Sequence, residues 1–158
     1  MGIPMPESLI QASADTSFFI RLMNDRDPLH PNAREYFEFL MKNDHVLTLS
    51  TIAIAEYCVR GRIDELPLAN LNVIPFESSH AERSGAFAGA AFDAGIIVSE
   101  RRIIPNDCNL FAQADIEGAT LFLTSDERSR NLYKLIKERF GVKFRFVNIR
   151  EPIDAVLT

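Results

Sequence analysis

Short apolar segments alternate with amphipathic segments along the whole chain, and this alternation is the feature that most constrains its fold. A short apolar run is typical of a buried strand, whereas apolar residues recurring at i, i+3, i+4 and i+7 are typical of a helix. Strands that alternate with helices favour a parallel sheet covered on both faces, with right-handed crossovers between the strands. The sequence therefore predicts an α/β fold built on a mainly parallel sheet.

Five segments have the composition of strands. The first is the weakest, because Gln11, Ala12 and Ser13 are poor strand formers. The expected strands cover residues 9–14, 46–49, 71–76, 119–123 and 143–147. We therefore expect a sheet of five strands.

Helices are expected between these strands. The clearest lies in residues 30–44, where apolar side chains repeat at helical spacing. Ser79 and Glu82 form the pattern of a capping box, which predicts the start of another helix. Further helices are expected after residues 15 and 50, at about 107–117, and from about 125 to the residue before Gly141.

Length and charge bound the classes of protein that this chain can represent. A chain of 158 residues fits one domain, which we place at residues 1–150 with a C-terminal tail at 151–158. The net charge of -5 disfavours attraction of the whole molecule to nucleic acid or anionic membrane, so a phosphate-bearing partner must be bound locally. The sequence shows no export signal and no apolar run long enough to span a bilayer, and Cys58 and Cys108 fit a reducing compartment. A cytoplasmic protein without membrane contact is expected.

Four acidic residues stand out from those on exposed helix faces. Asp15 and Asp126 follow expected strands, Glu56 lies in the helix after the second strand, and Asp107 opens the helix before the fourth. In a parallel sheet such positions can converge at the carboxyl edge, where ligands of α/β proteins collect. Any one of them alone would be read as a helix cap, but four at one edge indicate a site.

Such a convergence has a chemical consequence. Carboxylates packed closely repel one another and raise the pKa of at least one of them unless a cation is present. Oxygen ligands without His or Cys nearby suit Mg²⁺ or Mn²⁺. A divalent ion of this kind can polarise a phosphodiester and lower the pKa of a bound water, so hydrolysis of a nucleic-acid backbone is the natural use of the site.

The segments around these acids resemble the four motifs of PIN-domain ribonucleases, particularly the VapC-type toxins of toxin-antitoxin pairs. They are ADTSFF, STIAIAEYCVRG, IIPNDCNLFAQADIEGA and LFLTSDERS, and their order and spacing agree from about residue 9 to residue 147. Each motif alone is weak, whereas the ordered set is specific. The resemblance implies a three-layer α/β/α fold and cleavage of RNA by an Mg²⁺- or Mn²⁺-dependent endoribonuclease.

The resemblance also assigns roles to residues. Asp15, Glu56, Asp107 and Asp126 take the catalytic and metal-binding positions of the family, with Asp15 and Asp107 as direct metal ligands. Ser17 and Thr124 would orient carboxylates or water by hydrogen bonds. Ser129 stands where many relatives carry a further acidic or aromatic residue, which leaves one-metal and two-metal mechanisms both open.

Contacts with the substrate are less evident in the sequence. Arg101 and Arg102 precede Asp107, and Arg128 follows Asp126, so these three arginines are the candidates for binding RNA phosphates. His30, His45 and His80 are separate from the motifs and are expected to be exposed turn or capping residues. None of them is expected to act as a general base.

Two classes of function remain open at the level of sequence. The first is an active endoribonuclease, the toxin of a type II toxin-antitoxin pair, with an antitoxin partner and a homodimeric state. The alternative is a catalytically silent PIN-like module that binds RNA or a partner protein. Retention of all four acids favours the enzyme. A receiver domain or a haloacid-dehalogenase phosphatase is disfavoured, because Asp15 is followed by Thr16 and Ser17 and lacks the acidic partner that both require.

Overall fold

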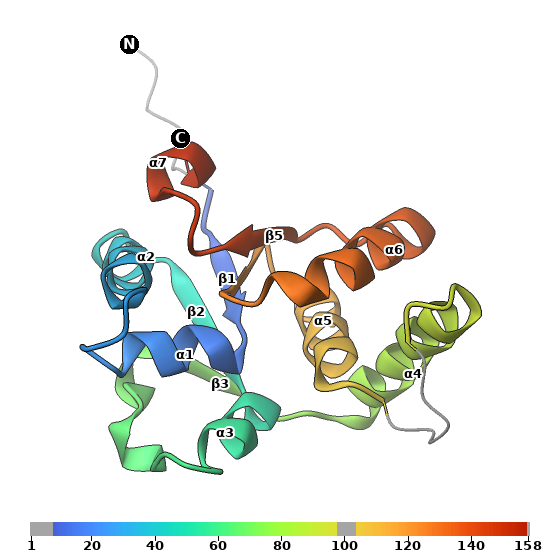
Figure 1. Ribbon diagram of the computed structural model, residues 1–158, viewed down its shortest axis with the longest axis horizontal. Helices are drawn as coiled ribbons and strands as arrows, with labels where there is room; N and C mark the ends of the chain where they lie inside the picture. Colours follow the sequence, from blue (N-terminus) through green and yellow to red (C-terminus); the bar gives the residue numbers. More distant parts are fainter. Residues whose placement is uncertain (1–7, 98–103, 158) are drawn as a thin grey trace.

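The computed structural model describes residues 8–97 and 104–157. Its centre is one sheet of five parallel strands in the order β3-β2-β1-β4-β5 (Figure 1). The strands are β1 (Gln11–Ala14), β2 (Val46–Ser50), β3 (Asn72–Ile74), β4 (Leu121–Thr124) and β5 (Arg145–Asn148). The prediction of a mainly parallel five-stranded sheet is confirmed.

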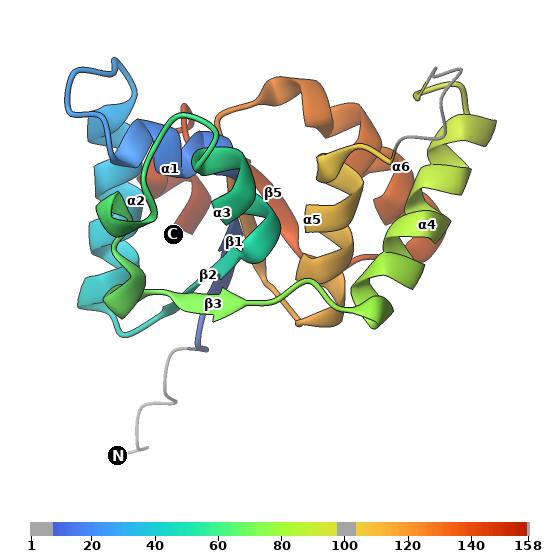
Figure 2. The same cartoon turned by 90° about the horizontal axis from the view of Figure 1, so that it is seen from below.

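Helices cover both faces of this sheet, which makes the fold a three-layer α/β/α sandwich as predicted. Figure 1 shows α1 and α2 on one side of the sheet and α4, α5 and α6 on the other, while α3 lies between α1 and α5 in Figure 2. The helices are α1 (Thr16–Leu22), α2 (His30–Lys42), α3 (Thr51–Tyr57), α4 (Ser78–Asp93), α5 (Asn106–Ile116), α6 (Arg130–Phe140) and α7 (Ile153–Leu157). Short 3₁₀ turns lie at η1 (Ile63–Glu65), η2 (Leu68–Asn70) and η3 (Glu127–Ser129).

Alternation along β4 divides the core into two clusters. Leu121 and Leu123 pack against the helices α1, α2, α3 and α7, whereas Phe122 between them packs against α4, α5 and α6. Successive side chains of a strand point to opposite faces, so a fully apolar strand supplies both cores at once. This is why the run Leu121–Thr124 is buried at every residue.

The surroundings of the central strand β1 explain why small residues of low strand propensity form it. Ala12 and Ala14 pack into the first core cluster, while Ser13 faces the other side and its hydroxyl lies 3.0 Å from that of Thr48 on β2. Small side chains let helices approach the middle of the sheet, and the hydroxyl pair satisfies two polar groups that a central strand would otherwise bury without partners. Tertiary pairing therefore overrides the low strand propensity of this segment.

Several boundaries differ from those expected. The strand expected over 71–76 is limited to Asn72–Ile74, and the helix expected from residue 125 is split into η3 and α6. The capping box predicted from Ser79 and Glu82 is wrong, because α4 begins at Ser78 and its capping box pairs Glu77 with His80. Gly141 does end α6, in the left-handed conformation at φ 65°.

The C-terminal segment adds to the first core cluster. Ile153 and Val156 of α7 are buried there, and the backbone oxygen of Glu151 accepts a hydrogen bond of 2.7 Å from the Tyr36 hydroxyl. The segment 151–157 is therefore packed into the first core cluster. No helix within 8–97 or 104–157 is both long and apolar enough to cross a membrane.

Phe111 gives a direct test of the second core cluster. Its ring is fully buried, with ring centroids 4.7 Å from Phe122 and 5.7 Å from Phe144. We expect Phe111→Ala to lower the free energy of unfolding by about 3–5 kcal/mol, because it removes apolar contacts and leaves a cavity. Urea unfolding followed by circular dichroism measures the change, and Ile96→Ala, at a side chain that is 40% exposed, is the control expected to change it little. An unchanged midpoint for Phe111→Ala would contradict this description of the core.

Candidate active site

The order of the strands fixes where a site can form. From the central strand β1 the chain builds β2 and β3 on one side and then β4 and β5 on the other. The connections therefore leave a crevice beyond the carboxyl ends of β1 and β4, the position at which open α/β sheets bind ligands. Asp15 follows β1 and Asp126 follows β4, so two of the predicted acids stand at this crevice.

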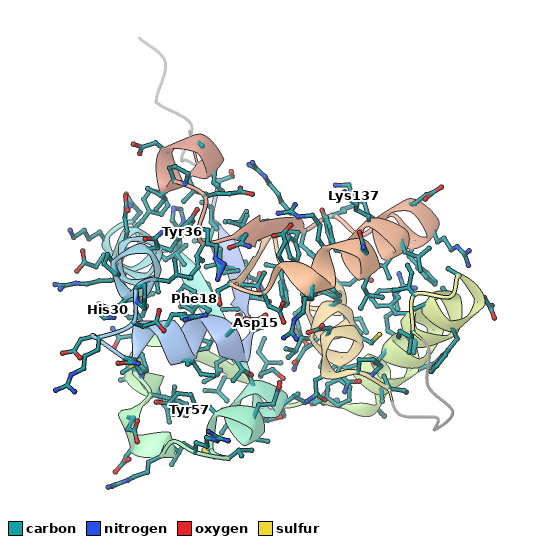
Figure 3. The ribbon with its side chains drawn as sticks, viewed as in Figure 1. Asp15, Phe18, His30, Tyr36, Tyr57 and Lys137 are labelled. Atoms are coloured by element: carbon teal, nitrogen blue, oxygen red, sulfur yellow. The ribbon has the colours of Figure 1, made fainter. Side chains whose placement is uncertain are left out.

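Asp15 lies where β1 gives way to α1 (Figure 3). It caps α1, because the backbone N–H of Phe18 donates to its Oδ1 at 3.2 Å. The Ser17 hydroxyl donates to the same oxygen at 2.6 Å, and the Thr124 hydroxyl donates to Oδ2 at 2.5 Å. Burial raises the pKa of Asp15 above its ordinary value, and these hydrogen bonds oppose the rise. The carboxylate is thus fixed in orientation by groups from α1 and β4.

Ser17 and Thr124 connect this carboxylate to the end of β4. The backbone N–H of Asp126 donates to Thr124 Oγ1 at 2.9 Å, and that of Ser125 donates to Ser17 Oγ at 2.9 Å. Each hydroxyl therefore accepts a bond from the loop after β4 while donating to Asp15. Both hydroxyls thus hydrogen-bond the Asp15 carboxylate, and the orienting role that the resemblance implies for Ser17 and Thr124 stays a prediction.

Glu56 enters the site from α3. Its Oε1 accepts a hydrogen bond of 3.1 Å from the hydroxyl of Thr16, the first residue of α1. Thr16 was not predicted as a site residue, although its position directly after Asp15 in the sequence could have indicated it. The bond holds α3 and the start of α1 together at the crevice.

Asp107 occupies the first turn of α5 and is half-buried. Burial raises the pKa of Asp107 to about 6, and the negative charges of Asp15, Asp126 and Glu56 add to the rise in that order. Three segments distant in sequence thus act electrostatically on one carboxyl group. This is the mutual repulsion expected of a converging acid cluster.

Asp126 differs from the other acids because it is paired with a cation. Arg128 Nε and Nη2 each donate to one of its carboxylate oxygens at 2.9 Å. Hydrogen bonding from Arg128 lowers the pKa of Asp126. The Arg128 side chain is itself 91% exposed, so this pair lies at the rim of the crevice.

One cleft of about 270 Å³ brings the four acids together. Its lining consists of Asp15, Thr16, Ser17, Ile20, Glu56, Asp107, Leu110 and Asp126. The side-chain atoms of this lining that could bind a metal are carboxylate and hydroxyl oxygens, and no His or Cys of the described ranges is among the lining residues. This set of ligand atoms fits a hard divalent cation.

The side chains do not form a closed cage for a metal. Among residues 8–97 and 104–157, no three His, Cys, Asp or Glu side chains are grouped closely enough to hold an ion together. Mg²⁺ characteristically uses one or two carboxylates and keeps several water ligands, so an open set of carboxylates is compatible with it.

The arginines predicted to bind RNA and the histidines predicted to be exposed differ in where they lie. Arg101 and Arg102 lie outside the described residues, and Arg128 is bound to Asp126. His80 is not exposed as predicted but is buried, with its Nδ1 accepting from the Glu77 backbone and its Nε2 2.8 Å from a Glu117 carboxylate oxygen. None of the three histidines, all of which the structure describes, lines the acidic cleft.

Comparison with known proteins identifies the fold and the family. The PIN domain family profile matches residues 14–135, a span that includes all four acids. No curated protein sequence matches the chain.

Solved structures of similar fold include toxin-antitoxin proteins. VapBC2 from Rickettsia felis, bound to a promoter DNA fragment, is 20% identical with a TM-score of 0.60, covering 88% of this chain and 98% of its own. VapBC-1 from nontypeable Haemophilus influenzae is 17% identical with a TM-score of 0.61, covering 90% of this chain and 100% of its own. The sarcin-ricin loop cleaving toxin VapC20 from Mycobacterium tuberculosis is 19% identical with a TM-score of 0.52, covering 77% of this chain and 95% of its own.

These structures are similar in fold over most of their length, and the family profile covers most of this chain. The chain therefore belongs to the PIN-domain family, and its fold resembles that of the VapBC proteins.

Proposed function

We propose that the protein is a metal-dependent endoribonuclease that hydrolyses RNA phosphodiester bonds. The observation that carries the proposal is the single cleft at the crevice between β1 and β4, lined by carboxylates from four separate segments. Membership of the PIN-domain family supports the same function.

The proposed roles follow from the contacts of each residue. Asp15 and Asp107 would hold the cation, which we propose to be Mg²⁺ or Mn²⁺, with Glu56 and Asp126 completing the negative environment. When bound, such an ion neutralises charge on phosphoryl oxygens and lowers the pKa of a bound water. Ser17 and Thr124 keep the Asp15 carboxylate in one orientation, so its geometry does not have to be organised during the reaction. Thr16 does the same for Glu56.

A silent PIN module that binds RNA or a protein without cutting is the alternative. The observation in its favour is the pairing of Asp126 with Arg128, which occupies both oxygens of one of the four acids. The exposure of Arg128 supports the enzyme instead. An exposed ion pair contributes little free energy, so the Arg128 side chain can leave the Asp126 carboxylate at little cost. The cleavage assay below separates the two functions.

We also propose that the protein is the toxin of a type II toxin-antitoxin pair and is inhibited by an antitoxin. A second groove of about 510 Å³ adjoins the acidic cleft and shares Ile20 and Glu56 with it. Val59 and Ile20 expose apolar surface there. The fold similarity to VapBC complexes supports an antitoxin segment as the occupant of this groove.

A homodimer in the cytoplasm is the proposed state of the protein. The resemblance to VapC-type toxins supports the dimer, and one face of α4 offers a surface for it. Ala81, Gly85 and Gly89 are exposed on that face at intervals of four residues. Small residues allow two helices to approach closely.

Substitution of Asp107 tests the proposed function. We expect Asp107→Asn to lower the rate of RNA cleavage by roughly a hundredfold or more, because it removes a charged metal ligand. The measurement is cleavage of single-stranded and hairpin RNAs in Mg²⁺ or Mn²⁺, with EDTA expected to abolish it. Asp93→Asn is the matched control, since Asp93 is exposed at the end of α4, away from the cleft. Equal rates for Asp107→Asn and the unsubstituted protein would refute the acid mechanism, and a wild-type protein that binds RNA without cutting would establish the silent module.

The raised pKa of Asp107 predicts a pH-dependent gain in stability for the same variant. The folded protein holds the Asp107 proton up to about pH 6, against an ordinary pKa of 3.8. The penalty for ionising Asp107 is therefore absent below about pH 4, grows as the pH rises to about 6, and is complete above it. Because Asn cannot ionise, Asp107→Asn in EDTA should be more stable than wild type at pH 7.5 by about 1–2 kcal/mol, after loss of a favourable interaction with the α5 dipole.

Thermal melts across this pH range measure the effect. The gain in melting temperature should disappear at pH 4, and Mn²⁺ should narrow it at pH 7.5 by stabilising the wild-type protein alone. A variant that melts below the wild type at pH 7.5, or a difference that is independent of pH, would contradict the electrostatic description of the cleft.

A further inference from the structure

The register of the sheet places Arg150 at the same edge as the acidic cleft. Strand β5 pairs with β4 so that Asn148 is opposite Thr124. Asp126 and Arg150 each follow two residues later, at equivalent positions beyond neighbouring strands. Adjacent strands are about 4.8 Å apart, so this register brings the two residues to the same edge of the sheet.

Matching hydrogen bonds hold the two strand ends in the same way. The backbone N–H of Asp126 donates to Thr124 Oγ1 at 2.9 Å, and that of Arg150 donates to Asn148 Oδ1 at 3.0 Å. The Asn148 side chain also donates to Glu127 Oε2 at 2.8 Å, which ties the end of β5 to η3. The backbone that carries Arg150 is therefore fixed relative to the backbone that carries Asp126.

Neighbouring arginines at this edge are already engaged with carboxylates. Arg128 binds Asp126, and Arg21 binds Asp27 at 2.5 Å. Arg130 binds Glu127 and lies over the Phe146 ring at 4.7 Å from its centroid. The Arg150 side chain is exposed and forms no ion pair with any residue in the described part of the chain.

The charge of Arg150 acts on Asp126 at the rim of the cleft. Hydrogen bonding from Arg128 is the largest cause of the lowered pKa of Asp126, and the positive charge of Arg150 contributes to the same shift. Arg150 is thus close enough to influence a carboxylate of the site while its guanidinium stays available to a ligand.

We propose that Arg150 binds a backbone phosphate of the RNA strand that crosses the acidic cleft, on the β5 side of Asp126. The proposal rests on the proposed function and adds to it a substrate contact that the motifs do not contain. With a net charge of -5, the protein must attract phosphates by local cations, and a guanidinium can bind a phosphate through two parallel hydrogen bonds. Such a contact positions the strand without reading its bases.

The test measures binding separately from cleavage. A fluorescein-labelled single-stranded RNA of about 12 nucleotides is titrated with the full chain in EDTA, and anisotropy gives the dissociation constant at several salt concentrations. The variants are Arg150→Ala, Arg150→Lys and the control Arg139→Ala. Arg139 is also exposed, but it lies near the end of α6 that is distant from η3.

The account predicts a loss of affinity specific to Arg150→Ala. Its dissociation constant should rise roughly three- to tenfold. The negative slope of log affinity against log salt should become shallower by about 0.7, the value for one phosphate contact on a single strand. Arg150→Lys should recover part of the affinity, and Arg139→Ala should resemble the wild type. Melting temperatures of all three variants should match the wild type, because both side chains are exposed.

Three other outcomes would contradict either the role of Arg150 or the function on which it rests. Wild-type affinity and salt slope for Arg150→Ala would overturn the role of Arg150 while leaving the nuclease proposal intact. An equal loss for Arg139→Ala would show general charge attraction and would also overturn it. A wild-type protein that neither binds nor cuts the RNA would remove the proposed function itself, and the role of Arg150 with it.

Discussion

The parallel pairing of β1 with β4 is the constraint on which the site depends. Its register places Ala14 opposite Leu123, so the residues that follow, Asp15 and Thr124, meet at the end of the sheet. The backbone N–H of Asp15 donates to the Leu123 oxygen at 3.1 Å, and the Thr124 hydroxyl donates back to the Asp15 carboxylate. Since β1 is the point from which the chain builds to both sides, this pairing also creates the crevice into which α3 and α5 bring Glu56 and Asp107.

Gathering these acids works against the stability of the fold. Burial raises the pKa of both Asp15 and Asp107, which means that ionising either of them costs free energy in the folded protein. The two apolar clusters on the faces of the sheet supply the stability that tolerates this cost, while hydroxyl donors from Ser17 and Thr124 reduce it at Asp15. The carboxylates of the candidate site are thus strained electrostatically, whereas the scaffold around them is well packed.

The sequence predicted the parts that local patterns control. Apolar runs located β2, β3, β4 and β5, helical periodicity located the helices, and only β1 had a weak signal. The positions of the acids at strand and helix ends indicated that they converge at one edge of the sheet. The burial of His80 was not predicted, because it depends on contact between α4 and α5, segments that the sequence does not show to be neighbours. The position of Arg150 likewise follows from the register of β5 on β4, which no local pattern contains.

Direct observation of the cation tests the central claim that carboxylates from distant segments jointly bind a divalent metal. Crystals of the protein grown with Mn²⁺ should show an anomalous difference peak in the cleft, within coordination distance of carboxylate oxygens from both Asp15 and Asp107. A peak held by only one of these residues, a peak elsewhere on the surface, or an ordered cleft without a peak at saturating Mn²⁺ would contradict the claim.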